Sequence, residues 1–308
     1  MYHESADYLA KLIHRADPRL EVVALKTPVA LRSALPEIEI LFAPQPPRDG
    51  WMAATKLRLI QLLGSGADHL LPSPDLPSSV DIAGVRGMFA PDVAEHALAL
   101  MLAHSRRLVQ IVEAQRAKRF ESTPRPTLAG KQLAIVGYGE VGRRLARAAL
   151  ALDMTVVAVS RTGKHPKPDV QLLGVESLPA AICDAHYIVV AAPLTPATVK
   201  LIDGALMSRM RPDAFIINVA RAGIVDEPAL CEALTAGRLG GAALDVFADE
   251  PLPPDSPLWN VPRLLITPHV AGLGERYIER CIEALLANVS ALASGTPRLG
   301  VIDRDVGY

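Results

Sequence analysis

The chain has few cysteines, few aromatic residues and no long uninterrupted apolar run. Its three cysteines, Cys183, Cys231 and Cys281, lie far apart and have neither disulfide-framework nor metal-site spacing, so no metal site is predicted. Such cysteine usage is typical of a reducing compartment, and we expect a cytoplasmic protein. The 2 Trp, 6 Tyr and 5 Phe among 308 residues are too few to suggest a base-stacking surface.

The charges show no excess of either sign. The 32 Lys and Arg residues nearly balance the 33 Asp and Glu residues, so no net field favours nucleic acid or acidic lipid. No stretch reaches the roughly 20 apolar residues of a membrane span, and the first residues lack a signal-peptide pattern. We therefore expect neither a nucleic-acid nor a membrane partner. The length favours two domains over one.

Residues 131–162 have the pattern of a strand–turn–helix–strand unit. An apolar run at 133–136 precedes the turn GYGEVG at 137–142, a helical pattern continues to about residue 152, and a second apolar run spans 156–159. A GxGxxG turn with a strand before it and a helix and strand after it indicates a dinucleotide site rather than a glycine-rich surface turn.

Each glycine of this turn has a physical role. Gly137 allows the tight bend, Gly139 lets the backbone approach a pyrophosphate, and Gly142 lets the helix pack on the strand. The first helical residues, Glu140 and Val141, would offer unpaired N–H groups and partial positive charge to that anion.

The end of the second strand indicates which dinucleotide is bound. An NAD site normally has an acidic residue there, but this chain has Ser160, Arg161 and Thr162, followed by Lys164 and Lys167. Hydroxyls and a guanidinium would bind a 2′-phosphate, so we predict NADP(H) as the preferred cofactor, with NAD(H) possible. The alternative is a solvated basic loop.

Residues 1 to about 95 form a separate α/β segment, with a helix at 5–15 and strands at 20–25, 39–42 and 57–63. The last strand ends in a glycine-rich turn, in which the N–H groups of Ser65 and Gly66 could hold a carboxylate. Alternatively, Gly66 only turns the chain into the next helix. From Asp92 to about residue 117, an amphipathic pattern predicts one long helix, which we expect to bridge two domains.

Four further strands, at 187–192, 214–220, 241–247 and 264–267, alternate with helices. This alternation predicts a parallel sheet, and ligands in such sheets bind outside the carboxyl ends of the strands. Polar side chains follow these ends: Arg221, Glu250 and His269. We expect them at one edge, beside the dinucleotide.

These three side chains suit carbonyl reduction. A hydride delivered to a carbonyl carbon requires a proton for the developing alkoxide, and His269 is the histidine that follows a sheet strand. Glu250 could accept a hydrogen bond from its other ring nitrogen, and Arg221 could bind a substrate carboxylate. His69, near the Ser65 turn, is the rival histidine. The structural alternatives are a core histidine, a loop carboxylate and an ion-paired arginine.

With these residues in view, the chain resembles the D-isomer-specific 2-hydroxyacid dehydrogenase family. The matching stretches, in family order, are VAEHALALML, VGYGEVG, APLTPATVKLI, NVARAGIVDEPAL, GGAALDVFADEPLPPDSPLW and LLITPHVAG. The resemblance implies an α/β fold of two doubly wound parallel-sheet domains. A Rossmann cofactor domain, residues 96–275, would be inserted into a flavodoxin-like substrate domain, residues 1–95 and 276–308.

The resemblance also implies roles for individual residues. Arg221, Glu250 and His269 would be catalytic, and Ser65, Gly66 and Arg221 would bind the substrate carboxylate. Asp245 would contact the nicotinamide amide. The expected cofactor-binding set is Gly137, Gly139, Glu140, Val141, Gly142, Ser160, Arg161, Thr162, Pro193, Ala220, Asp245 and His269. Family members are usually homodimers built through the cofactor domain.

The likeness is greatest to the branch of NADPH-dependent glyoxylate/hydroxypyruvate reductases. It implies reduction of a small 2-keto acid to its D-2-hydroxy acid; the alternative is a corepressor-like, dinucleotide-sensing module without significant turnover. Three departures stand out. The chain begins where the family's first strand should end, Arg86 replaces a frequent proline, and Ala90 replaces a frequent threonine.

Overall fold

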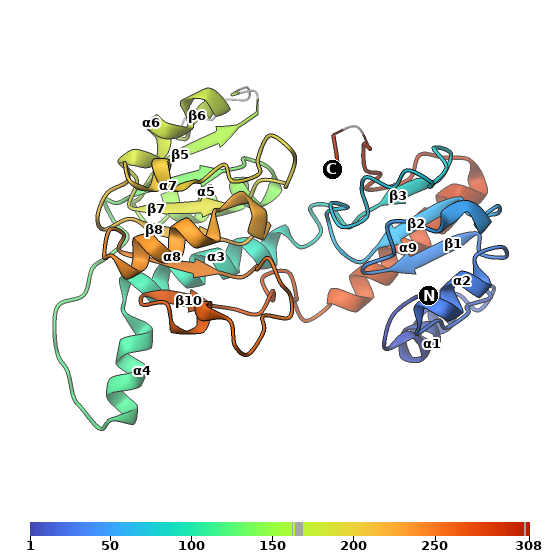
Figure 1. Cartoon of the computed structure of the whole chain (residues 1–308), viewed down its shortest axis with the longest axis horizontal. Helices are drawn as coiled ribbons and strands as arrows, with labels where there is room; N and C mark the ends of the chain where they lie inside the picture. The colour runs from blue at the N-terminus through green and yellow to red at the C-terminus, as the bar shows by residue number, and fades with distance from the viewer. Residues whose placement is uncertain (162, 164–168, 305) are drawn as a thin grey trace. The chain divides into compact units, whose positions relative to one another are not determined.

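The structure, a computed structural model, describes residues 1–161, 163, 169–304 and 306–308. The chain forms two compact units, one of Met1–Phe89 with Glu275–Tyr308 and one of Ala90–Gly274 (Figure 1). The sequence pattern set the first boundary near residue 95. The division falls earlier because the whole of helix α3 (Ala90–Ser105) packs with the second unit, where it lies against α5 (Glu140–Leu150).

The second unit contains a seven-stranded, all-parallel sheet in the order β10-β9-β8-β7-β4-β5-β6. Its strands are β4 (Gln132–Val136), β5 (Thr155–Ser160), β6 (Gln171–Gly174), β7 (Tyr187–Val190), β8 (Phe215–Asn218), β9 (Gly241–Leu244) and β10 (Leu264–Ile266). Successive strands step one way from β4 and the other way from β7. The β4–β7 neighbourhood is therefore the topological switch point, where ligands bind in such sheets.

Helices cover both faces of this sheet, because both faces are apolar. Along β4, Ala134 and Val136 join one core, while Leu133 and Ile135 join the other. Helices α3 and α5 lie on the second of these faces. The other face is covered by α6 (Leu178–Cys183), α7 (Gly204–Met207) and α8 (Glu227–Thr235).

The single long helix expected from Asp92 onward is wrong: two helices take its place. The chain leaves α3 through Arg107, whose φ of 53° is left-handed, and then forms α4 (Leu108–Arg116). Figure 1 shows α4 directed away from the sheet of its own unit. The apolar spacing continues through the break, so periodicity alone could not reveal it.

The first unit contains a smaller parallel sheet in the order β1-β2-β3, with β1 (Ile40–Ala43), β2 (Leu59–Leu62) and β3 (Asp81–Ala83). Its helices are α1 (Ala6–Ala16), α2 (Pro28–Ala34) and α9 (Tyr277–Ser294). The strand expected at 20–25 does not form. Within this segment only Leu25 pairs with another residue, in an isolated bridge with Tyr2. Short 3₁₀ helices lie at Trp51–Ala53, Val175–Ser177, Ala222–Ile224 and Pro257–Asn260.

None of the helices within the described residues combines the length and the apolar character needed to cross a membrane.

Candidate active site

The glycine turn after β4 lies at the switch point and has the geometry of a dinucleotide cradle. Gly137 has φ +105°, and a Cβ there would lie 2.6 Å from the backbone of Ala191, which follows β7. A Cβ on Gly139 would meet nothing within 4 Å, so that side of the turn is open. Helix α5 starts at Glu140, and no side chain caps it. Its first N–H groups are available to a pyrophosphate, and the turn fits a dinucleotide.

The end of β5 presents a hydroxyl and a guanidinium. Ser160 is the last residue of the strand, and its Oγ accepts a hydrogen bond from the N–H of Gly163 at 3.1 Å. Arg161 follows and is exposed. Thr162, Lys164 and Lys167, which the sequence adds to this group, lie outside the described residues.

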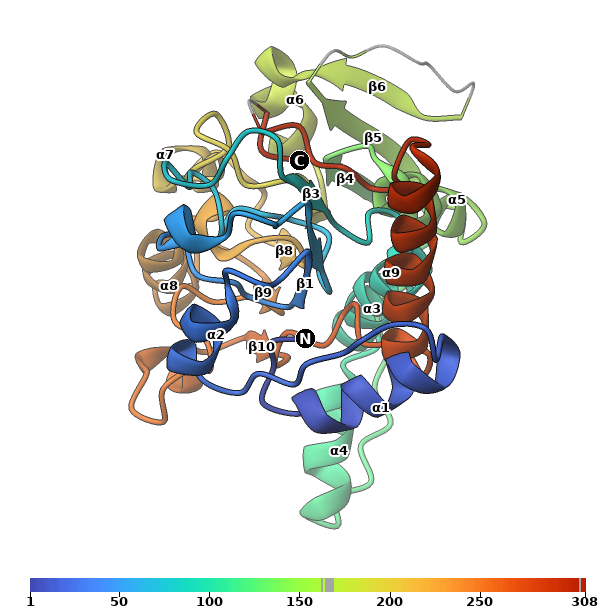
Figure 2. The same cartoon turned by 90° about the vertical axis from the view of Figure 1, so that its right-hand side faces the viewer.

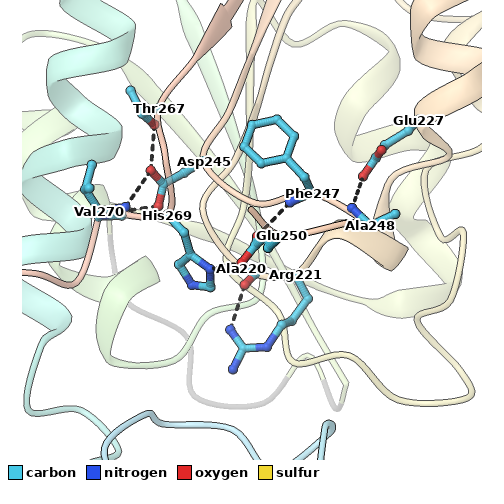
Figure 3. A network of polar contacts seen from close by, with 11 residues as sticks. Ala220, Arg221, Glu227, Asp245, Phe247, Ala248, Glu250, Thr267, His269 and Val270 are labelled. Atoms are coloured by element: carbon cyan, nitrogen blue, oxygen red, sulfur yellow. Dashed lines mark hydrogen bonds and ion pairs between the residues drawn. The ribbon is translucent and has the colours of Figure 1, made fainter. Parts of the chain in front are cut away.

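The carboxyl ends of β8, β9 and β10 bring distant parts of the sequence to one edge of the sheet. These strands are parallel neighbours, so the segments that follow them leave on the same side. Arg221 follows β8, Asp245 and Glu250 follow β9, and His269 follows β10 (Figure 3). Pro193 follows β7 at the same edge.

Glu250 and His269 form a direct contact. His269 Nδ1 lies 2.7 Å from Glu250 Oε2, and Glu250 Oε1 accepts a hydrogen bond from the N–H of Phe247 at 2.9 Å. A carboxylate only accepts hydrogen bonds, so Nδ1 carries the proton in this contact and Nε2 is left for another partner. The His269 side chain is 49% exposed, so Nε2 is accessible to a ligand.

Asp245 fixes the backbone that carries His269. Its buried carboxylate accepts hydrogen bonds from the N–H groups of Val270 (3.0 Å) and Ala271 (2.9 Å) and from the Thr267 hydroxyl (2.6 Å). His269 lies between these anchors with φ 53°, a conformation that side-chain-bearing residues rarely adopt. The observed contacts of Asp245 therefore hold the His269 loop, a role the sequence did not indicate.

His96 extends this network to helix α3. Its Nε2 lies 3.0 Å from Thr267 Oγ1 and 3.5 Å from Asp245 Oδ1. The hydroxyl proton of Thr267 goes to Asp245, so His96 Nε2 is the donor to Thr267. His96 lies in the segment for which the sequence predicts a helix, but no sequence pattern indicates its partner; only the tertiary fold brings it to Thr267.

Arg221 is positioned by a buried asparagine. Asn218, the last residue of β8, accepts from the N–H of Ala220 at 3.1 Å and donates to the carbonyl of Arg221 at 2.8 Å. Arg221 Nη1 donates to the carbonyl of Ala220 at 2.8 Å, and Figure 3 shows its side chain in the same cluster as His269. A polar residue ending an apolar strand was the available sequence signal for Asn218.

Glu227, on the first turn of α8, supports the loop that carries Glu250. Its carboxylate accepts a hydrogen bond from the N–H of Ala248 at 3.1 Å (Figure 3). Burial raises the pKa of the Glu227 carboxyl, and the nearby Asp249 and Glu250 carboxylates act in the same direction, while the Ala248 hydrogen bond opposes them.

The glycine turn with Ser65 and Gly66 belongs to the first unit, within Met1–Phe89. The carbonyl of Gly64 accepts from the N–H of Val85 at 3.1 Å, and Ser65 Oγ donates to the carbonyl of Val85 at 3.4 Å. Within the described part of the chain, the N–H groups of Ser65 and Gly66 donate no hydrogen bond. They remain available to an anion.

Known proteins resemble the chain over most of its length. The sequence model of the D-isomer specific 2-hydroxyacid dehydrogenase NAD binding domain matches residues 98–271. A glyoxylate/hydroxypyruvate reductase A from Yersinia enterocolitica is 31% identical over 271 residues, 86% of each chain. A glycerate dehydrogenase from Methylorubrum extorquens is 32% identical over 253 residues, 79% of this chain and 78% of its own.

A crystal structure of an NADPH-dependent glyoxylate/hydroxypyruvate reductase from Sinorhizobium meliloti, in complex with NADP and sulfate, matches with a TM-score of 0.87. Its identity to this chain is 27%, and the match covers 98% of this chain and 96% of that one.

A dinucleotide turn at the switch point of a parallel sheet, with acid–base side chains on the same edge, is the arrangement expected of a dinucleotide-dependent oxidoreductase. The similar sequences and the similar crystal structure identify the family within this class of enzyme. The chain belongs to the D-isomer specific 2-hydroxyacid dehydrogenase family and is a dehydrogenase that interconverts 2-hydroxy acids and 2-keto acids.

Proposed function

We propose that the enzyme reduces a small 2-keto acid of the glyoxylate or hydroxypyruvate kind to its D-2-hydroxy acid, with NADPH as the preferred reductant. The observation that carries the proposal is the 2.7 Å contact between His269 Nδ1 and Glu250, which leaves Nε2 for another partner on the sheet edge shared with the GxGxxG turn. The reductases among the relatives support this choice of substrate.

In the proposed mechanism, bound NADPH supplies the hydride that reaches the carbonyl carbon. His269 gives the proton from Nε2 to the developing alkoxide, and Glu250 stabilises the imidazole in the orientation and tautomer needed for that transfer. Arg221 binds the substrate carboxylate. In the first unit, the amides of Ser65 and Gly66, which donate no hydrogen bond within the described residues, are open to an anion. Asp245 and Thr267 hold the backbone of His269.

The preference for NADPH rests on the end of β5. Ser160 and Arg161 offer a hydroxyl and a guanidinium to a 2′-phosphate, and neither repels it as an acidic side chain would. In Arg161→Ala, the KM for NADPH should rise about tenfold or more while the KM for NADH changes little, because a charge-assisted hydrogen bond contributes about 1.5–3 kcal/mol. Equal effects on both cofactors would contradict the assignment.

The substrate assignment is tested by following NADPH and NADH absorbance with a panel of 2-keto acids that includes glyoxylate, hydroxypyruvate and pyruvate. We expect turnover, fastest with NADPH and the smallest acids. Folded protein that binds NADPH but turns over no member of the panel would favour the dinucleotide-sensing alternative and reject the proposal.

We also propose a homodimer assembled through α4. This helix exposes Leu108 (46%), Val109 (41%), Ile111 (40%) and Val112 (44%), and Phe120 beyond it is 99% exposed. Figure 2 shows α4 projecting from its own unit. Contiguous exposed apolar side chains on such a helix are typical of an interaction surface.

A further inference from the structure

Helix α3 contacts the segment that carries His269 at both ends of that segment. Before His269, the Nε2 atom of His96 lies 3.0 Å from Thr267 Oγ1. Beyond His269, a Cβ built on Gly274 would overlap a carboxylate oxygen of Asp92, so the helix is in direct contact with the chain there as well. The helix and this segment both belong to the second unit, Ala90–Gly274.

Helix α3 is a rigid support because it is part of the core of this unit. Its buried side chains pack with one face of strand β4; they are Ala94, Ala97, Leu100 and Met101. A side chain on a packed helix is held in place more precisely than one on a loop. His96 therefore presents its ring nitrogen to the His269 loop from a fixed position.

The direction of the hydrogen bonds gives His96 a specific task. The Thr267 hydroxyl has one proton, which goes to Asp245 Oδ1 at 2.6 Å because a carboxylate only accepts. The same hydroxyl oxygen then accepts from His96 Nε2. A side chain at this position that could only accept would draw the Thr267 proton away from Asp245. The donor of His96, rather than its bulk, is what the network uses.

The Asp245 carboxylate acts on the backbone beyond His269. It is buried and accepts from the N–H groups of Val270 and Ala271, so every donor it keeps offsets the cost of burying a charge. His269 itself has φ 53°, a conformation that persists only where the surrounding structure enforces it. Loss of the Thr267 donor would weaken that enforcement.

We propose that His96 is a positioning residue for proton transfer: by donating to Thr267, it keeps Asp245 bound to the backbone around His269 and so keeps the imidazole in its reactive orientation. Displacement of a catalytic group by about 1 Å costs up to about 100-fold in rate, so an indirect contact of this kind is sufficient to affect turnover. This inference rests on the proposed function, in which His269 gives the proton.

The first test compares two substitutions of His96. In His96→Leu, kcat with NADPH and glyoxylate should fall about 10- to 100-fold, while the KM for glyoxylate and the Kd for NADPH stay within about 3-fold, because no group that binds either molecule is removed. In His96→Gln, the side-chain amide can place an N–H donor where Nε2 lies, and kcat should stay within about 3-fold of the wild type.

A double-mutant cycle tests whether the effect runs through the Thr267 hydroxyl. Thr267→Val removes the hydroxyl and should lower kcat as His96→Leu does. Adding His96→Leu to Thr267→Val should then cost no more than about 2-fold further, because the path is already broken.

His104 on the same helix provides the matched control. Its ring packs against those of Phe215 and Tyr187, with centroid distances of 3.9 Å and 5.9 Å. His104→Leu should leave kcat within about 2-fold, although it changes the packing of α3.

Hydrogen exchange at the amides of Val270 and Ala271 provides a readout that needs no turnover. Exchange should be at least about tenfold faster in His96→Leu and in Thr267→Val than in the wild type and in His96→Gln, because the loop opens more often when Asp245 holds it less firmly.

Equal losses of kcat in His96→Leu and His96→Gln, additive losses in the double variant, or unchanged amide exchange in His96→Leu would overturn the inference while the proposed function stood. Wild-type protein that reduces no 2-keto acid would instead reject the proposed function, and the exchange rates would still decide whether His96 holds the loop.

Discussion

Glu250 and His269 meet only in the folded chain, and their contact sets the direction in which the imidazole can act. The carboxylate accepts at Nδ1 and is itself fixed by the N–H of Phe247, so both of its oxygens are engaged. At the scale of single residues, the sequence was sufficient to predict this pair, because each side chain follows a strand whose carboxyl end had to reach the same edge.

Glu250→Gln should lower kcat about 10²- to 10⁴-fold, because an amide removes the charge and can present a donor that favours the wrong tautomer of His269. The measurement is steady-state NADPH oxidation with glyoxylate. Asp249→Asn, which removes the exposed neighbouring carboxylate, is the matched control and should leave kcat within about 2-fold. A Glu250→Gln enzyme as fast as this control would exclude the supporting role of Glu250.

The residues that position His269 and Arg221 could not be predicted in the same way. Asn218, Thr267 and His96 are polar residues whose partners are fixed by tertiary contacts; His96 and Thr267 are 171 positions apart. A sequence pattern reports periodicity and turn chemistry, and it contains no information on such a pairing. Asp245 was singled out for the nicotinamide amide, a contact still to be tested, while its hold on residues 267–271 emerged only from the structure.

Among the elements, the strand–turn–helix unit from β4 to β5 agrees most closely with the prediction from the sequence. Its strands are continuous apolar runs buried on both faces, which give a strong signal. The prediction was weaker where an element is short or depends on its neighbours. The three-residue β3 has too few residues for a pattern, and the apolar run at 20–25 has no adjacent strand to complete a ladder.

Gly137 and Gly139, in the glycine turn after β4, differ in physical role, which gives a prediction at the scale of one element. Gly139→Ala should raise the Kd for NADPH at least about tenfold, or about 1.4 kcal/mol, with an unchanged melting temperature, because its Cβ would enter only open space. Gly137→Ala should instead destabilise the fold by about 1–3 kcal/mol, since its Cβ would clash with the backbone of Ala191.

Fluorescence titration with NADPH and thermal unfolding of the two variants provide the comparison. If Gly139→Ala bound NADPH like the wild type, the pyrophosphate would not lie against this turn.

For the whole molecule, the exposed side chains of α4 predict self-association. The wild-type protein should have the mass of a dimer in size-exclusion chromatography with light scattering, and Val109→Asp combined with Val112→Asp should give monomers, because buried unpaired carboxylates oppose association. Glu113→Gln on the same helix is the control and should remain dimeric. A monomeric wild-type protein, or a dimeric double variant, would contradict the assignment of this surface.

The proposed role of His269 as the proton donor for carbonyl reduction is tested most directly by kcat for His269→Gln with NADPH and glyoxylate. We expect kcat to fall about 10²- to 10⁴-fold, with the Kd for NADPH unchanged. A kcat within about 3-fold of the wild type, in protein that still binds NADPH, would show that the proton comes from another group.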